Sequence, residues 1–278
     1  MYEIKDKVIL VTGGAAGIGA GVVKSFAEER AKHVAIIDVD VTNGTALEKE
    51  LNNKYGSDKT KFYKCDVTSQ DLHDIYDEIV KSYGYIDVVI NNAGIMNDSP
   101  RLYEKEIAIN LTALVTSSLK AFNLMRKDYG GKGGTIVNIS SIVALIPGRV
   151  LPIYSATKSA VLQFSYSLGD EMHYKRSQVR VITMCFGCTH TSLFSPEKLE
   201  AFDKETTDYT MRAVSGGGSL PFQKPESAVR GLVEAFKKGK PGSTWLVSAD
   251  RQAEDITANI KKSFEILSQG VYTPNTNS

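Results

Sequence analysis

Short apolar runs alternate with longer amphipathic stretches along most of the chain. Runs rich in β-branched residues predict strands: Val8–Thr12, Val34–Asp38, Phe62–Asp66, Val88–Asn91, Thr135–Ile139, Val179–Cys185 and Thr244–Val247. The stretches with apolar residues at three- and four-residue spacing predict helices: Ile18–Arg30, Gly44–Tyr55, Leu72–Tyr83, Tyr103–Asp128, Tyr154–Tyr174 and Pro225–Lys238. We therefore expect an α/β protein with a single doubly wound parallel sheet of about seven strands and helices on both faces.

Two segments depart from this alternation. Residues 189–220 mix apolar and charged side chains and close in Ser215-Gly-Gly-Gly-Ser219, which we interpret as a substrate flap with a glycine hinge. A plain surface excursion is the alternative interpretation. Beyond Asp250 the chain ends in Pro-Asn-Thr-Asn-Ser, which offers little to pack. We expect one domain over residues 1–250, flap included, and a fraying C-terminal tail over residues 251–278.

Composition and charge exclude several classes of protein. The 278 residues are 42% hydrophobic and 23% charged, with a formal net charge of +1, so neither disorder nor a general attraction to nucleic acid or anionic membranes is expected. The first apolar run, Val8–Val11, is too short for a signal peptide or membrane span. Cys65, Cys185 and Cys188 are an odd number, which favours reduced thiols. We expect a cytoplasmic protein with a small-molecule substrate.

A glycine-rich turn, Thr12-Gly-Gly-Ala-Ala-Gly-Ile-Gly19, lies where the first strand gives way to a helix. In this position Gly13 permits a tight turn, Gly17 lets the backbone approach a pyrophosphate, and Gly19 permits close packing of helix on strand. The free amides at the start of the helix would face the anion. The turn therefore predicts a dinucleotide site.

Asp38 ends the second strand about twenty residues after this turn, where a carboxylate can accept hydrogen bonds from ribose hydroxyls. A carboxylate would repel a 2′-phosphate, and neither Val39 nor the glycine turn supplies a cation to counter it. The sequence thus favours NAD over NADP. A solvated carboxylate at the end of a strand is the alternative.

The residues that would carry the reaction lie farther along the chain. Tyr154 and Lys158 lie one turn apart on one helix face, and a nearby ammonium favours the phenolate of a tyrosine whose reference pKa is about 10. Ser140, at the end of the preceding strand, can donate a hydrogen bond to the substrate oxygen. Asn110 has an amide suited to holding Lys158 through water. This set predicts a tyrosine acid/base.

The order and spacing of these motifs resemble the short-chain dehydrogenase/reductase family from the first strand to about Val247. The resemblance is carried by Thr12-Gly-x-x-x-Gly17-x-Gly19, Asp66, Asn91-Asn-Ala-Gly94, Asn110, Ser140 and Tyr154-x-x-x-Lys158. It implies a Rossmann-type fold and NAD as cofactor. It implies the catalytic residues Asn110, Ser140, Tyr154 and Lys158. It also implies a set of cofactor-binding residues: Gly13, Gly17, Ile18, Gly19, Asp38, Asp66, Val67, Asn92, Ala93, Gly94, Tyr154, Lys158, Gly187, Thr189 and Thr191.

In this family pattern each part of the cofactor has its own residues. Asp66 and Val67 would meet the adenine, residues 92–94 would line the cofactor cleft, and Lys158 would also hold the nicotinamide ribose. Tyr154 would take the hydroxyl proton as the hydride leaves the alcohol. Oxidation of a hydrophobic alcohol is therefore the expected reaction, or its reverse.

Within the family, residues 130–140 and the approach Pro152-Ile-Tyr154 resemble NAD-dependent 15-hydroxyprostaglandin dehydrogenases, and also insect alcohol dehydrogenases and their photoreceptor-dehydrogenase relatives. Gly242-Ser-Thr-Trp-Leu adds to the insect likeness. This resemblance implies a secondary or allylic alcohol on a lipid-, retinoid-, prenyl- or steroid-like molecule.

One run departs from the family pattern. Where the family has proline and glycine after the sixth strand, this chain has Phe186 and Gly187. Losing the proline relaxes the local φ restriction, and we expect the Phe186 ring beside the cofactor. Cys185-x-x-Cys188-x-His190 in the same run lacks the four ligands of a structural zinc site, so we expect no metal.

The loop Ile142–Ile153 between Ser140 and Tyr154 is almost wholly apolar apart from Arg149. We expect it to line a pocket or to be covered by the flap, which predicts a largely hydrocarbon substrate. Burial against another subunit is the alternative. Arg149 either pairs with a substrate carboxylate or faces solvent.

Two other functions remain open at this point. An NADPH-preferring carbonyl reductase has the same motifs, but Asp38 argues against it. A non-catalytic nucleotide-binding scaffold is also possible on this fold, but the intact set of reactive residues argues against it. By the resemblance, the apolar residues of the helices Tyr103–Asp128 and Tyr154–Tyr174 would form the interface of a homodimer or homotetramer.

Overall fold

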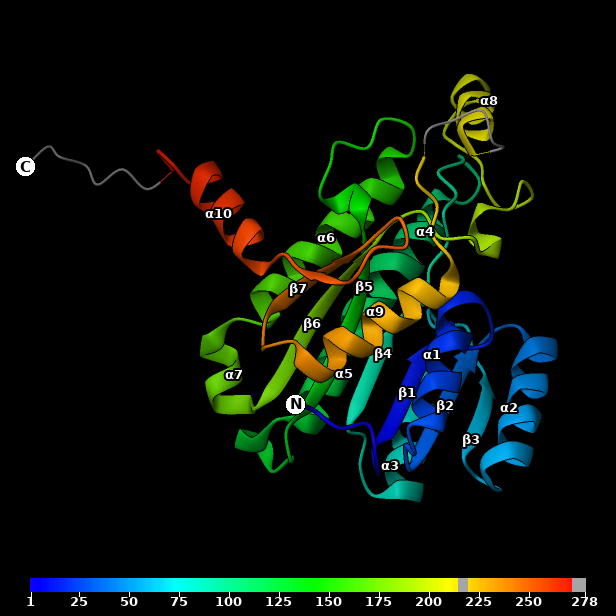
Figure 1. The fold of residues 1–278 in the computed structure, drawn as a ribbon, viewed down its shortest axis with the longest axis vertical. Helices are drawn as coiled ribbons and strands as arrows, with labels where there is room; N and C mark the ends of the chain where they lie inside the picture. The colour runs from blue at the N-terminus through cyan, green and yellow to red at the C-terminus, as the bar shows by residue number, and fades with distance from the viewer. Residues whose placement is uncertain (215–219, 272–278) are drawn as a thin grey trace, which may run out of the picture.

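The structure is a computed structural model that describes residues 1–214 and 220–271. Its centre is one sheet with the strand order β3-β2-β1-β4-β5-β6-β7-β8 (Figure 1). The strands are β1 (Val8–Thr12), β2 (His33–Asp38), β3 (Thr60–Lys64), β4 (Val88–Asn91), β5 (Gly134–Ser141), β6 (Val179–Phe186), β7 (Ser243–Val247) and β8 (Glu254–Asp255). All pairings are parallel except the last, between β7 and β8. The expected parallel α/β sheet is confirmed, with a short antiparallel strand added at one edge.

Helices cover both faces of this sheet. One face packs against α1 (Gly17–Glu28), α2 (Val41–Tyr55) and α9 (Pro225–Lys238). The other packs against α3 (Asp71–Tyr83), α5 (Leu114–Met125) and part of α6 (Pro152–Leu168). The strands are buried because each is enclosed by side chains from two helical layers, as their near-continuous apolar sequences predicted.

Two of the predicted helices are interrupted. The stretch from Tyr103 consists of α4 (Tyr103–Ile107), a π-helical turn (Ala108–Ala113) and α5. The stretch from Tyr154 breaks after α6, and Asp170 caps a separate α7 (Glu171–Ser177) by accepting a hydrogen bond from the Met172 amide. π-turns insert one residue into a helix and often lie at functional sites, and this one carries Asn110.

The described part of the flap, 189–214, lies beside the loop 142–153. It contains a short 3₁₀ turn at Ser192–Phe194 and α8 (Lys204–Arg212). Leu199 and Ala201 are buried within a cluster that also includes residues of the loop. The expected covering of the loop by this segment is therefore present, whereas the proposed hinge, 215–219, lies outside the described residues.

The expectation of an unpacked tail is wrong over residues 251–271. This segment contains β8 and α10 (Thr257–Leu267). Ile256 and Ile260 are buried against Leu162 of α6 and Cys185 of β6. Phe264 packs against Tyr166 of α6 in the same cluster. Apolar side chains at four-residue spacing therefore give the segment a face that anchors it to the domain. The terminal Pro-Asn-Thr-Asn-Ser lies outside the described residues.

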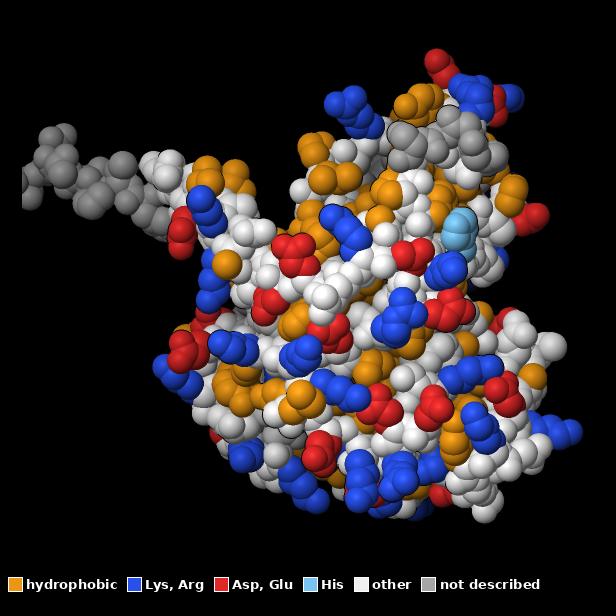
Figure 2. Space-filling model, in the orientation of Figure 1, with side chains coloured by type: hydrophobic (Ala, Val, Ile, Leu, Met, Phe, Trp, Pro, Cys, Tyr) orange, Lys and Arg blue, Asp and Glu red, His pale blue; other side chains and the backbone are white. Residues whose placement is uncertain are grey.

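The surface agrees with the near-zero net charge, since basic and acidic side chains are interspersed on the face in Figure 2. Within the described ranges, one helical run, Tyr103–Met125, is long and apolar enough to cross a membrane, with a mean hydropathy of 1.3 over its best window. Core helices often have these properties too. This run packs against β4 and β5 and carries Asn110, as a core helix of the fold does.

Candidate active site

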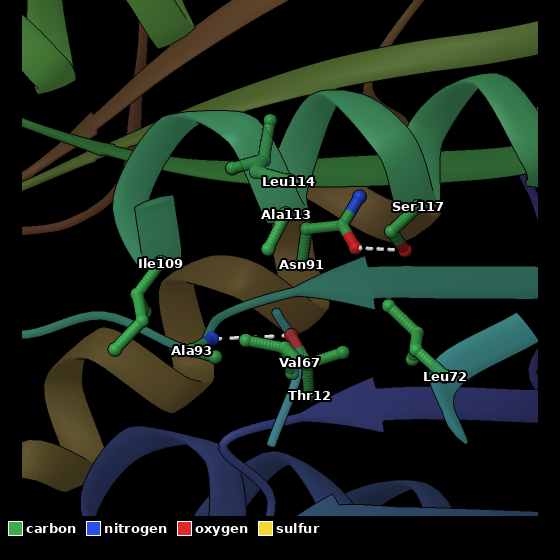
Figure 3. A pocket seen from close by; sticks show the side chains of 9 residues that line it. All are labelled: Thr12, Val67, Leu72, Asn91, Ala93, Ile109, Ala113, Leu114 and Ser117. Atoms are coloured by element: carbon green, nitrogen blue, oxygen red, sulfur yellow. Dashed lines mark hydrogen bonds between the residues drawn. The ribbon is translucent and has the colours of Figure 1, made fainter. Parts of the chain in front are cut away.

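The carboxyl ends of β1 and β4 meet where the strand order reverses, which is where open α/β sheets bind their ligands. The Thr12 hydroxyl at the end of β1 accepts hydrogen bonds from the amides of Asn92 (3.0 Å) and Ala93 (3.1 Å). The Asn92 side chain in turn donates to the carbonyls of Thr12 and Gly13, both at 3.0 Å. These bonds join the two turns into one rigid wall. A small cavity lies against it, lined by Thr12, Ala93 and Val67 among others (Figure 3).

The glycine turn has the backbone geometry that its sequence predicted. Gly13 and Gly17 have φ values of +63° and +52°, in the left-handed region that favours glycine. A Cβ at Gly19 would lie 2.0 Å from the Gly13 carbonyl oxygen. Helix α1 begins at Gly17 without a side-chain cap from Ala16. Its first amides, which include that of Ile18, thus have no side chain competing for an anion, and the turn fits a pyrophosphate.

Asp38 has a second role that the sequence did not reveal. Its Oδ2 accepts a hydrogen bond from the Ala15 amide and its Oδ1 accepts one from the Asp40 amide, each at 3.0 Å. The carboxylate therefore fixes the glycine turn as well as ending β2. Each carboxylate oxygen can accept a further hydrogen bond, so this arrangement still permits contacts with ribose hydroxyls.

Asp66 follows β3 and accepts hydrogen bonds from the amide (3.0 Å) and hydroxyl (2.7 Å) of Thr68. These bonds hold the pKa of the Asp66 carboxyl below its usual range. Val67, the next residue, shares the small cavity with Ala93. The two residues expected to meet the adenine thus lie at the same sheet edge as the glycine turn.

Asn110 and Lys158 come together across Gly94. The Asn110 amide donates to the Ile95 carbonyl at 2.8 Å, and its Oδ1 accepts from the Ile95 amide at 2.9 Å. A Cβ at Gly94 would lie 3.2 Å from Asn110 Oδ1 and 3.5 Å from Lys158 Nζ. Asn110 therefore positions the 94–95 backbone directly, in addition to any contact with Lys158 through water.

The structure corrects the choice of serine. The Ser140 hydroxyl is buried and donates to the backbone carbonyl of Lys158 at 2.8 Å, so it is turned away from the phenol. The side chain of Ser141 lies near the Tyr154 phenol and lowers its pKa. Successive residues of a strand point to opposite faces, so only one of two adjacent serines can face Tyr154. Ser141 is the functional candidate that the sequence reasoning missed.

Burial shifts the pKa of both reactive side chains away from their charged forms. It raises the pKa of the Tyr154 phenol, which the nearby Ser141 side chain partly offsets. It lowers the pKa of Lys158 to about 8, partly offset by the negative charge of Glu106. The Lys158 ammonium donates to the Ile139 carbonyl at 3.1 Å and lies 5.7 Å from the centre of the Tyr154 ring. Without further positive charge, Tyr154 therefore holds its proton at neutral pH.

The segment after β6 joins the same site. The Thr189 hydroxyl donates to the Gly187 carbonyl at 2.9 Å, and Thr191 lies against Gly17, whose added Cβ would be 3.3 Å from the threonine Cγ2. Phe186 pairs with Ser141 and Val247 as the last residue of β6. Its ring is buried in the cluster of apolar side chains that includes residues of α1 and α9, and the expectation that it lies beside the cofactor stays a prediction.

Comparison with known proteins identifies the family of this chain. The family model for short chain dehydrogenases matches residues 7–201. The chain belongs to the short-chain dehydrogenase family. Similar proteins include the 15-hydroxyprostaglandin dehydrogenases [NAD(+)] of Macaca fascicularis, 34% identical over 73% of this chain and 74% of that protein, and of Homo sapiens, 33% identical over the same shares. Alcohol dehydrogenase 1 of Ceratitis cosyra is 32% identical over 88% of this chain and 92% of that protein.

An apolar wall adjoins the reactive tyrosine of this short-chain dehydrogenase. Tyr154 is clustered with Met96, Leu151, Leu199 and Ala201. Side chains of the flap and of the loop 142–153 pack around them: Val143, Val150, Leu193, Phe194, Met211 and Val214. Arg149 in the same loop is exposed. No cluster of three or more metal-ligating His, Cys, Asp or Glu side chains occurs within residues 1–214 and 220–271.

Two buried acids of this short-chain dehydrogenase also escaped the sequence reasoning. Asp98 and Glu106 flank the start of α6, immediately before Tyr154. Neither belongs to a motif with regular spacing. A charged residue inside the predicted helix Tyr103–Asp128 suggests a solvated face, and only the fold shows that Glu106 is enclosed.

Proposed function

We propose that this short-chain dehydrogenase transfers a hydride between a hydrophobic secondary or allylic alcohol and NAD, with Tyr154 as the acid/base. The observation that supports this most strongly is the buried arrangement of Ser141, Tyr154 and Lys158 at the edge of the sheet that also carries the glycine turn. A phenol beside a hydroxyl, with an ammonium on the next helical turn, can move one proton at one substrate oxygen.

Different residues of the site suit the different chemical groups of NAD. The uncapped start of α1 suits the pyrophosphate, Asp38 suits the adenosine ribose, and the cavity beside Val67 adjoins the adenine side of the cleft. NAD would supply the hydride acceptor and, in its oxidised form, a positive charge that favours the phenolate of Tyr154. Asp38 disfavours a 2′-phosphate, which argues for NAD over NADP.

In alcohol oxidation, Tyr154 Oη takes the hydroxyl proton while the hydride leaves the adjacent carbon. In carbonyl reduction the same phenol returns the proton. Ser141, which lies near the Tyr154 phenol, would donate to the substrate oxygen as it gains negative charge. Lys158, whose pKa is lowered to about 8 by burial, keeps a substantial cationic fraction at neutral pH that stabilises the phenolate.

The cluster of Met96, Leu151, Leu199 and Ala201 beside Tyr154 supports a hydrophobic substrate. Apolar contacts bind a hydrocarbon body, and the few polar atoms at Ser141 and Tyr154 fix its oxygen. We propose lipid-, retinoid-, prenyl- or steroid-like alcohols as the substrate class. We also propose a cytoplasmic location, since Cys65, Cys185 and Cys188 are all free thiols.

The test is a panel of hydrophobic secondary and allylic alcohols with NAD, monitored by NADH absorbance. Tyr154→Phe removes the hydroxyl but keeps the ring, so we expect at least about a 100-fold loss of kcat. The Kd for NAD, measured by fluorescence, should stay within about three-fold because the glycine turn is untouched. NADP in place of NAD is the matched control and should bind more weakly.

If Tyr154→Phe keeps most of the wild-type rate, the proposed acid/base is wrong. A wild-type protein that binds NAD but turns over no alcohol or carbonyl in the panel would instead support the scaffold alternative. Preference for NADP would support the carbonyl reductase.

A further inference from the structure

Two carboxyl groups are buried side by side at the start of the helix that carries Tyr154. Glu106 on α4 is 0% exposed and Asp98, in the segment after β4, is 1% exposed. Carboxyl groups are rarely buried unless partners compensate for the lost hydration. The hydrogen-bond partners of Asp98 and Glu106 therefore indicate the role of the two carboxyl groups.

Asp98 caps α6 from a distance. Its Oδ2 accepts a hydrogen bond from the Ile153 amide at 2.7 Å, and its Oδ1 accepts one from the Tyr154 amide at 3.0 Å. The residue at the N-cap position, Leu151, has no side chain that could do this. Asp98 itself is tied to the flap, because its amide donates to the Glu200 carbonyl at 2.8 Å. The first amides of α6 thus depend on a carboxylate more than 50 residues away in sequence.

Glu106 has only one conventional partner. Its Oε1 accepts a hydrogen bond from the Asn97 amide at 3.0 Å, while its Oε2 meets no donor within the described part of the chain. The carboxyl group of Asp98 is a direct neighbour of the Glu106 side chain. Two carboxyl groups can share a hydrogen bond only when one of them carries a proton.

The surroundings place that proton on Glu106. Both Asp98 oxygens already accept amide hydrogens, whereas Glu106 Oε2 meets no donor among the described residues. Burial and the neighbouring Asp98 raise the pKa of Glu106 from 4.5 to about 8, partly offset by the Asn97 amide and by the positive charge of Lys158. The other ionisable group influenced by Glu106 is the Tyr154 phenol.

We propose that Glu106 and Asp98 share one proton and act as a positioning pair that fixes the first turn of α6, and with it Tyr154, for the proposed reaction. Neither residue contacts the reacting atoms, so the pair acts through the helix. A displacement of about 1 Å at a reacting group can cost about 100-fold in rate. The inference rests on the proposed function for the role of Tyr154, but the shared proton can be measured without turnover.

The first experiment compares the thermal unfolding of wild type and Glu106→Gln between pH 5 and pH 8. Over this range the folded chain keeps a proton on Glu106 that the unfolded chain has lost, so the stability of the wild type falls as pH rises. Glutamine has no such proton. We expect the Tm of the wild type, relative to that of Glu106→Gln, to fall by at least about 4 °C between pH 5 and pH 8.

Other titrating groups do not confuse this comparison. Burial lowers the folded-state pKa of Lys158 from 10.5 to about 8, so the folded chain loses this proton mainly at and above pH 8, where this group makes the stability rise with pH. The lowered pKa of His33 affects both proteins equally and cancels in the difference. Glu104→Gln, on the exposed side of α4, is the matched control and should follow the wild-type curve.

The second experiment tests the positioning role with Asp98→Asn, whose amide can accept only one of the two backbone hydrogens well. We expect kcat to fall at least about ten-fold while the KM for NAD stays within about two-fold. Hydrogen exchange at the Ile153 and Tyr154 amides should accelerate by a similar factor. Glu106→Gln, which can still donate to Asp98, should retain about ten-fold more activity than Glu106→Ala.

Each outcome decides one part of the proposal. Parallel Tm curves for wild type and Glu106→Gln would overturn the shared proton. Unchanged exchange and kcat in Asp98→Asn would overturn the positioning role. If the wild type turns over no alcohol while the Tm and exchange results hold, the pair is upheld as the clamp on α6 and the proposed function fails separately.

Discussion

Adjacent serines at the end of β5 have different roles because a strand turns them in opposite directions. Ser141 lies near the Tyr154 phenol, whereas the Ser140 hydroxyl donates to the backbone carbonyl of Lys158. One serine therefore acts on the phenol, and the other braces the turn of α6 that carries the ammonium.

Substituting the two serines separately should reveal this division. We expect Ser141→Ala to lower kcat by about 100-fold, because it removes a donor to the developing oxyanion. Ser140→Ala should cost about 1 kcal/mol of stability through a lost buried hydrogen bond, with a much smaller loss of kcat. Steady-state kinetics and urea unfolding of both variants measure the two effects. A larger kcat loss in Ser140→Ala than in Ser141→Ala would assign the donor to the substrate oxygen to Ser140 instead.

The parts of the site that sequence predicted are those with local spacing. Four of these residues can be recognised from the sequence because a turn or one helix face fixes their geometry within a few residues: Gly13, Gly17, Tyr154 and Lys158. To choose Ser141, one must know which side chains of β5 point toward Tyr154. The sequence does not show this, because both faces of the strand are buried and apolar residues occur on both. The Asp98–Glu106 pair required contacts between α4, α6 and the flap, which no local pattern encodes.

At the level of elements, the alternation of buried strands and amphipathic helices was sufficient for the sheet and most of its helices. It did not reveal the π-turn at Ala108–Ala113, because one inserted residue barely changes a helical pattern. It also missed α10, although Ile256, Ile260 and Phe264 follow one another at four-residue spacing and form its anchoring face. Tertiary packing against α6 and β6 stabilises this short helix.

Helix α10 should therefore contribute to stability. Ile260 is 7% exposed and packs in a cluster with Leu162 and Cys185. We expect Ile260→Ala to lower the free energy of unfolding by about 2 kcal/mol. Leu267→Ala on the same helix, where the side chain is 73% exposed, should change it by less than about 0.5 kcal/mol. Urea denaturation compares the two, and equal effects would mean that α10 does not dock as described.

At the scale of the whole molecule, fewer apolar residues are available for a subunit interface than the two predicted helices Tyr103–Asp128 and Tyr154–Tyr174 suggested. Leu114 and Val161 are buried within the subunit and are not available to a partner. Leu111, Val115 and Leu119 are spaced four apart along one face of this helical stretch, and Leu119 is 44% exposed. This stripe remains the candidate surface for a homodimer or homotetramer.

Gel filtration at micromolar concentration tests this surface. We expect the wild type to elute as a dimer or tetramer of the 30.4 kDa chain and Leu119→Glu to elute as a monomer, because a charge cannot be buried in an apolar interface without a large cost. Met172→Glu, an exposed position on α7, is the control and should leave the elution unchanged. A wild type that elutes only near 30 kDa contradicts the proposal.

The short strand β8 also bears on how the protein behaves in a crowded solution. It pairs with Trp245 and Leu246 and so occupies backbone groups that β7 would otherwise offer to a foreign strand. At the opposite edge, β3 presents the charged Lys61 and Lys64 to solvent. Both edge strands thus carry exposed charged side chains, which disfavour pairing with a second chain, and α10 follows β8 directly and anchors it. Loss of the C-terminal segment would open a route to aggregation even in a chain whose active site is intact.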